Sequence, residues 1–141
     1  MTRRIELITR SVRTHHRNEM IDVTDLVRDA AADAKINDGM AIVYVPHTTA
    51  ACTIKENADP DVKHDVLAKL SELIPKQEPY YQHGEGNSDS HVKTSLVGNS
   101  STVLIEAGRL VLGQWQGIYF CEFDGPRSRK LLIKLVSFDG P

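Results

Sequence analysis

The spacing of apolar and polar residues changes along the chain, and these changes predict where strands and helices lie. Residues 4–9 roughly alternate, which is typical of a strand with one buried face. Thr24 has the chemistry of a helix N-cap, the apolar residues of 26–34 recur at helical spacing, and the turn residues 37–39 end that helix. The apolar run 40–45 is continuous and stops at a proline, so we expect a central strand buried on both faces.

A second helix is marked by its first residues. Asp59 can cap it, Pro60 suits the first helical position, and Asp61 complements the positive end of the helix dipole. Pro75 stops the helix, and one apolar stripe is formed by Val62, Val66, Leu70 and Leu73. Residues 75–90 have no period and predict a loop, and a short third helix is expected from about Ser88 to Gly98.

The last third of the chain is rich in strand-forming residues. Gly or Gly-Pro turns separate its apolar stretches, which predict strands at 103–105, 110–112, 117–123 and 130–138. Strands and helices that are intermixed, with a run of strands at the end, favour an α+β fold. We therefore expect a single domain over residues 1–141, with a large, mostly antiparallel sheet or sandwich and two to three helices.

Composition narrows the classes of partner. A formal net charge of −2 does not supply the basic face that nucleic acids or acidic membranes attract, so we expect neither partner. No apolar run approaches the roughly 20 residues that span a bilayer, and the first residues lack the apolar core of a signal peptide. Cys52 and Cys121 indicate no disulfide framework, and burial as reduced thiols is the simplest interpretation. These features predict a cytoplasmic protein.

The first group of candidate site residues follows the apolar run 40–45. His47 lies just past a predicted buried strand, which would fix its position while leaving it open to solvent. An acid–base group or a metal ligand requires that combination. A purely structural histidine is the alternative. Cys52 lies close in sequence, so a thiolate ligand is a further alternative to its burial.

The second group, residues 83–91, is denser in reactive side chains. Its two glycines let the backbone approach a ligand closely, and Asn87 or Ser88 can cap the following helix, whose start attracts phosphate or carboxylate. His83 and His91, together with His47, could make a three-histidine site for a divalent metal such as zinc. The spacing matches no standard zinc signature, and a solvated loop that caps a helix is the alternative. We expect Gly86, Asn87 and Ser88 to contact the bound group.

The third group, residues 122–129, follows an apolar strand. Asp124, Gly125 and Pro126 are good turn residues, so a simple hairpin is one interpretation. Arg127 and Arg129 nevertheless offer forked N–H donors that suit phosphate oxygens. The two interpretations are compatible, and we treat Asp124 and Arg127 as candidate ligand-binding residues.

Three long stretches together resemble the YjbQ-like family, also called secondary thiamine-phosphate synthases. They are HTTAACTIKENADPDVKHD (47–65), HGEGNSDSHVKTSLVGNS (83–100) and GRLVLGQWQGIYFCEFDGPRSRK (108–130). The resemblance covers essentially the whole chain in register. It implies an α+β fold, assembly as a homotrimer, and a site near the subunit boundary that holds a metal or an anion. Cys52 stands where an aliphatic residue is expected, which argues against a required thiol.

Carried over by position, the resemblance assigns roles to individual residues. His47, His83 and His91 look like metal-facing histidines, with Glu85, Asp89, Asp124 and Arg127 as their polar companions and catalytic candidates. The implied cofactor is a divalent ion, zinc or magnesium. The implied reaction joins hydroxymethylpyrimidine pyrophosphate to a thiazole phosphate, releases pyrophosphate and gives thiamine monophosphate. A side activity of the family is the alternative interpretation of this reaction. The implied partner is thus a phosphorylated small molecule.

Two other functions are compatible with the same residues. A binding protein would hold a metal or phosphate on these side chains without chemistry. A metal-dependent hydrolase would use three histidines and an open position to lower the pKa of a bound water to about 7.

Overall fold

The computed structural model describes residues 5–139, and within them the chain forms eight strands and three helices. The strands are β1 (Ile5–Arg13), β2 (Glu19–Asp22), β3 (Gly39–Tyr44), β4 (Ala50–Glu56), β5 (Ser100–Glu106), β6 (Arg109–Leu110), β7 (Gln116–Glu122) and β8 (Ser128–Ser137). The helices are α1 (Thr24–Asp33), α2 (Pro60–Leu73) and α3 (Ser88–Val97). None of these helices is long and apolar enough to cross a membrane.

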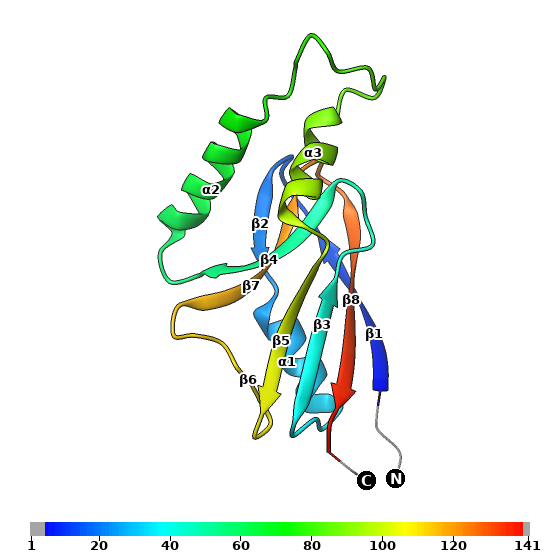
Figure 1. Cartoon of the computed structure of the whole chain (residues 1–141), viewed down its shortest axis with the longest axis vertical. Coiled ribbons are helices and arrows are strands. Elements are labelled where there is room, and N and C mark those ends of the chain that lie inside the picture. Colours follow the sequence, from blue (N-terminus) through cyan, green and yellow to red (C-terminus); the bar gives the residue numbers. More distant parts are fainter. Residues whose placement is uncertain (1–4, 140–141) are drawn as a thin grey trace.

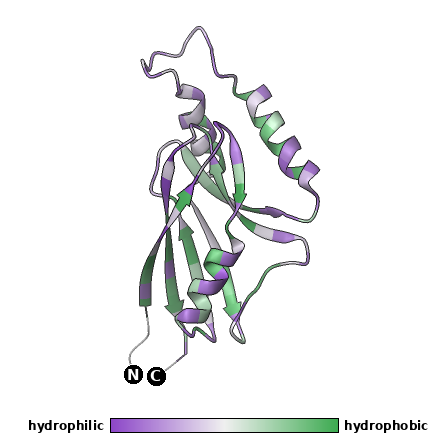
Figure 2. Cartoon of the chain, turned by 180° about the vertical axis from the view of Figure 1, so that it is seen from behind, coloured by the Kyte–Doolittle hydropathy of each residue, from purple (hydrophilic) through white to green (hydrophobic). Residues whose placement is uncertain are grey.

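The strands form two antiparallel sheets that share one core. The larger sheet has the order β1-β8-β3-β5-β6, and the smaller one has the order β2-β7-β4. Inward residues alternate along β8 as Leu131, Ile133 and Leu135, and along β7 as Ile118 and Phe120. These side chains belong to one core cluster together with buried residues of α1. Figures 1 and 2 show the two sheets and α1 from opposite sides. The expected α+β domain is confirmed.

Helices α1 and α2 differ in how deeply they pack. Val27, Ala30, Ala31 and Ala34 of the α1 segment recur at helical spacing and are buried in the core. Helix α2 has no buried residue, because it lies over the outer face of the small sheet. Asp59 accepts a hydrogen bond from the Asp61 N–H at 2.9 Å, as the sequence predicts for the cap of α2. A long loop leads from α2 to α3 (Figure 1).

Several expected element bounds need correction. The first strand continues to Arg13, while its expected start at residue 4 lies outside the described residues. Thr24 is the first residue of α1 and not its cap, because the Asp22 carboxylate accepts the Thr24 N–H. The expected strand 110–112 is reduced to β6, and Leu73 of the expected α2 stripe is 61% exposed. Strands β2 and β4 were not predicted.

The outer face of the larger sheet is open, which corrects the expectation that strand 40–45 is buried on both faces. The register places Ile5, Val136, Met40 and Leu104 in one row across β1, β8, β3 and β5. Ile5 and Leu104 are more than half exposed, and Tyr44 is 45% exposed. Burial therefore alternates along β3, with only its inward side chains in the core.

Candidate functional site

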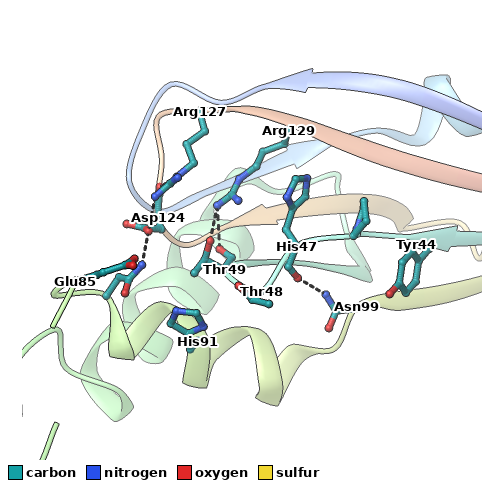
Figure 3. A pocket seen from close by; sticks show the side chains of 12 residues that line it. Tyr44, His47, Thr48, Thr49, Glu85, His91, Asn99, Asp124, Arg127 and Arg129 are labelled. Carbon is teal, nitrogen blue, oxygen red and sulfur yellow. Dashed lines mark hydrogen bonds and ion pairs between the residues drawn. The ribbon is translucent and has the colours of Figure 1, made fainter. Parts of the chain in front are cut away.

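One cavity of about 630 Å³ gathers most of the predicted site residues. It lies where the loops that follow β3 and β7 meet the start of α3 (Figure 3). Among the predicted residues, the structure brings six to its lining: His47, Glu85, Asn87, His91, Asp124 and Arg127. His83, Gly86, Ser88 and Asp89 are outside that lining.

His47 is held by hydrogen bonds from two directions. The Asn99 amide donates to the carbonyls of Val45, His47 and Ala50 at 2.9, 2.8 and 3.3 Å, which fixes the loop after β3. The Lys130 N–H donates to His47 Nε2 at 3.0 Å. A backbone N–H can only donate, so Nε2 is unprotonated and a neutral ring carries its proton on Nδ1. Burial, followed by the nearby Arg129 guanidinium, lowers the pKa of His47 and favours this neutral form.

A second wall is built by Asp124 and its two partners. Asp124 Oδ2 accepts hydrogen bonds from Asn87 Nδ2 and Arg127 Nη2, each at 2.8 Å (Figure 3). Arg127 Nε also donates to the Asp124 carbonyl at 2.7 Å, yet the Arg127 side chain stays 51% exposed. Its other guanidinium donors can therefore serve a ligand. Asn87 Oδ1 is a buried acceptor with no partner within residues 5–139.

Arg129 forms the floor of the cavity with a buried carboxylate behind it. Arg129 Nε donates to Glu122 Oε1 at 2.8 Å, Nη2 also donates to Glu122, and Nη2 reaches Thr49 Oγ1 at 2.8 Å. Thr14 and the N–H groups of Phe123 and Asp124 complete the shell around Glu122. Burial alone would raise the pKa of Glu122, but these hydrogen bonds outweigh it and lower that pKa.

Strand alternation explains why this charged pair is buried. Glu122 continues the inward series of Ile118 and Phe120 along β7, and Arg129 begins the inward series of β8. The two sheets therefore bring a carboxylate and a guanidinium together at the end of the apolar core. A charged residue at the end of an apolar i, i+2 series is the sequence signal that could have revealed Glu122.

Asp89 is the main correction to the predicted site. Its side chain is 1% exposed and accepts hydrogen bonds from Arg17 Nη1 and Nη2 at 3.0 and 2.9 Å. Lys93 Nζ lies 3.5 Å from the same carboxylate. Asp89 therefore anchors the first turn of α3 and does not line the cavity. The i, i+4 spacing of Asp89 and Lys93 on the predicted third helix is a sequence signal for that pair, whereas nothing in the local sequence pointed to Arg17.

The predicted three-histidine metal site does not fit this arrangement. His83 and His91 form an edge-to-face pair with ring centroids 5.2 Å apart, but His83 lies outside the cavity lining. His47 Nε2 is already occupied by the Lys130 N–H. Within residues 5–139, no group of three His, Cys, Asp or Glu side chains is placed to hold a metal ion. Cys52 and Cys121 are both buried free thiols, as expected.

Comparisons with known proteins agree on one family. Residues 8–137 match the profile of the family described as UPF0047 protein YjbQ-like. UPF0047 proteins from Methanocaldococcus jannaschii and Bacillus subtilis are 52% and 51% identical to this chain. The matches cover 89% and 92% of this chain, and 90% and 98% of those proteins.

Solved structures show the same fold. A structure of the YjbQ/UPF0047 family from Clostridium acetobutylicum has a TM-score of 0.89 at 52% identity, covering 91% of this chain and 98% of its own. A structure from Sulfolobus solfataricus has a TM-score of 0.91 at 25% identity, covering 96% and 99%. It is described as a YbjQ-like protein of unknown function. These comparisons supply a family and a fold but no activity.

Proposed function

The chain belongs to the UPF0047 YjbQ-like family, and from its cavity we propose that it is an enzyme acting on a phosphorylated small molecule. The observation that carries the proposal is the composition of one cavity. Two guanidinium groups and two imidazole rings line it, facing two carboxylates and the start of α3. A volume of about 630 Å³ lies in the usual range for small-molecule sites.

The proposed anion site centres on Arg127. Its half-exposed guanidinium keeps donors available for phosphate oxygens, whereas the Arg129 side chain is 5% exposed and uses Nε and Nη2 to donate to Glu122 and Thr49. His47 can add its Nδ1–H as a neutral donor, because Nε2 is occupied. Such preorganised donors stabilise the charge that develops on a departing phosphate group.

His91 is the proposed proton-transfer group. Its ring lies on α3 and faces the cavity across from the His47 loop (Figure 3). Imidazole changes protonation near neutral pH, as acid–base catalysis requires. His47 is less suited to accept a proton, because protonation of Nε2 would break the hydrogen bond from Lys130.

We propose thiamine-phosphate synthesis as the specific reaction to test. The thiazole nitrogen would attack the methylene carbon of hydroxymethylpyrimidine pyrophosphate, so that a C–N bond forms and a C–O bond breaks. Pyrophosphate takes the bonding electron pair, accepts a proton from His91 on its departing oxygen and leaves toward Arg127. A divalent ion would come with the pyrophosphate and not as resident zinc, because Glu85 and Asp124 are oxygen ligands of the type magnesium prefers. The ion would neutralise phosphate charge.

We also propose that the chain acts in the cytoplasm as a homotrimer that buries the outer face of the larger sheet. The row Ile5, Val136, Met40 and Leu104 provides an apolar surface of the kind that marks protein interfaces. Tyr44 lies on this face and also lines the cavity, so a subunit packed there would border the site. Light scattering of a Leu104→Lys variant tests the assembly, and an unchanged trimer would contradict this interface.

The activity test measures pyrophosphate release and thiamine monophosphate formation from the two named substrates. We expect Arg127→Ala and His91→Ala each to lower turnover on the order of 10²–10³-fold. His64→Ala is the matched control, because His64 is exposed on α2, outside the cavity. Stoichiometric pyrophosphate binding without turnover of any phosphorylated substrate would instead establish a non-catalytic binding protein.

A further inference from the structure

A buried cluster of charges lies one layer behind the cavity wall. Asp89 accepts two hydrogen bonds from Arg17 and an ion pair from Lys93, and the Asp89 and Lys93 side chains are 1% and 2% exposed. Lys93 also donates to Asn18 and Ser71, and its Nζ lies 5.8 Å from the centre of the Phe123 ring. Arg17, Asp89 and Lys93 are called the rear cluster below.

The rear cluster is tied to two segments that line the cavity. Asp89 lies in the first turn of α3, between the lining residues Asn87 and His91. Arg17 donates to Ser90 Oγ at 3.3 Å, and Ser90 Oγ donates to the Phe123 carbonyl at 2.5 Å, directly before Asp124. The cluster therefore lies close to the cavity without contacting a ligand there.

The charges of the rear cluster do not cancel. Two cations share one carboxylate, and the remaining hydrogen-bond partners of Lys93 are neutral, so the cluster carries a net charge of +1. In the cavity itself, Arg127 is paired with Asp124, and Arg129 with Glu122. Glu85 lies 3.7 Å from His83 Nε2 and is an added negative charge on the lining when that ring is neutral. A positive charge behind the wall offsets that carboxylate for an incoming anion.

We propose that the rear cluster sets the affinity of the cavity for phosphate anions through its net charge, and that Lys93 supplies this charge. The inference rests on the proposed function, since it assumes that the cavity binds phosphate. A buried charge acts through a medium that screens it less than water does, so direct contact is unnecessary. Helix α3 adds to the effect, because its positive end faces the same way.

The experiment titrates inorganic pyrophosphate into the full chain by calorimetry, without divalent cations. Lys93→Met removes the charge of one cation and brings the cluster to zero, so we expect about tenfold weaker binding. Lys93→Met combined with Asp89→Asn restores a net charge of +1 and should return the affinity to within about twofold of the parent. Lys69→Met, which removes an exposed lysine on α2, should change the affinity less than about twofold.

The double variant separates charge from position. If Asp89 and Lys93 instead act by holding α3 in position, the double variant should bind pyrophosphate as weakly as Lys93→Met or more weakly. That result would overturn the inference. Thermal melts monitor folding. If only the double variant folds, its parent-like affinity supports the inference and a loss of binding overturns it. If the parent chain does not bind pyrophosphate, the proposed function fails and this inference fails with it.

Discussion

Glu122→Gln should strongly destabilise the fold, because it removes the counter-charge of a buried guanidinium. Arg129 is 6% exposed and Glu122 is fully buried, so water cannot replace the lost partner. The N–H groups of the glutamine amide would also face Arg129 or Thr14, which are themselves donors, so at least one hydrogen bond would be lost. Breaking a buried pair by neutralising one partner costs about 3–5 kcal/mol. That is a large share of the roughly 5–15 kcal/mol that stabilises an ordinary domain.

The loss should be visible as a lower melting temperature. For 141 residues the entropy of unfolding is about 0.3 kcal/mol per kelvin, so 3–5 kcal/mol corresponds to a fall of about 10–17 °C. Thermal and urea unfolding at one fixed protein concentration measure this change. Glu122→Gln combined with Arg129→Met should recover most of the loss, because neither buried charge then remains.

An exposed ion pair provides the control. Asp25 pairs with Arg28 across one turn of α1, but its side chain is 88% exposed. Asp25→Asn should therefore change stability by no more than about 0.5 kcal/mol. The reasoning is refuted if Glu122→Gln costs as little as this control, or if the double variant loses the sum of the two single effects.

Three further outcomes are expected. The pKa of His47 lies below its ordinary value of 6.5, so the unfolded chain binds a proton more readily than the folded chain does. The contribution of neutral His47 to the free energy of unfolding should therefore be fully present above pH 6.5 and decrease as the pH falls below that value. His47→Asn, which keeps an acceptor for Lys130, should flatten that part of the pH profile. Gly39→Ala would place Cβ 2.0 Å from the Val136 carbonyl oxygen and should lower the free energy of unfolding by on the order of 2–4 kcal/mol. Gly84→Ala, which has open space around it, should leave this free energy nearly unchanged when both variants are unfolded by chemical denaturant. EDTA should leave the melting temperature unchanged while lowering turnover of a pyrophosphate substrate; a large drop in melting temperature would indicate a resident metal ion.

The sequence predicts local structure well where its signals are redundant. Asp59, Pro60 and Pro75 mark α2 independently of its apolar stripe, and the observed helix lies between them. Strand β4 escaped prediction because Ala50, Ala51 and Cys52 are small and show no alternation, although the fold buries them on both faces. The apolar run at β3 indicated burial on both sides, yet a strand can be apolar on a face that the monomer leaves open.

Part of the candidate site was predictable, because several of its residues lie in short segments that are rich in polar side chains. Glu85, Asn87 and Asp124 belong to dense polar segments, and a residue's own neighbours were enough to single them out. Asp89 belongs to such a segment too, but its side chain turns toward Arg17 and Lys93. The i, i+4 spacing with Lys93 can be read from the sequence, but the contact with Arg17 depends on tertiary packing, and local spacing does not encode it.

The hydrogen bonds of the Asn99 amide make the His47 loop sensitive to deamidation of this one side chain. Its nitrogen serves three carbonyl oxygens, including that of His47 itself. Deamidation would exchange both N–H donors for a carboxylate oxygen facing the same three acceptors, and electrostatic repulsion would then push the His47 loop away from α3. Protein deamidated at Asn99, which is recognised by a mass gain of about one dalton in the peptide that contains this residue, should therefore lose its ligand site while it keeps its fold.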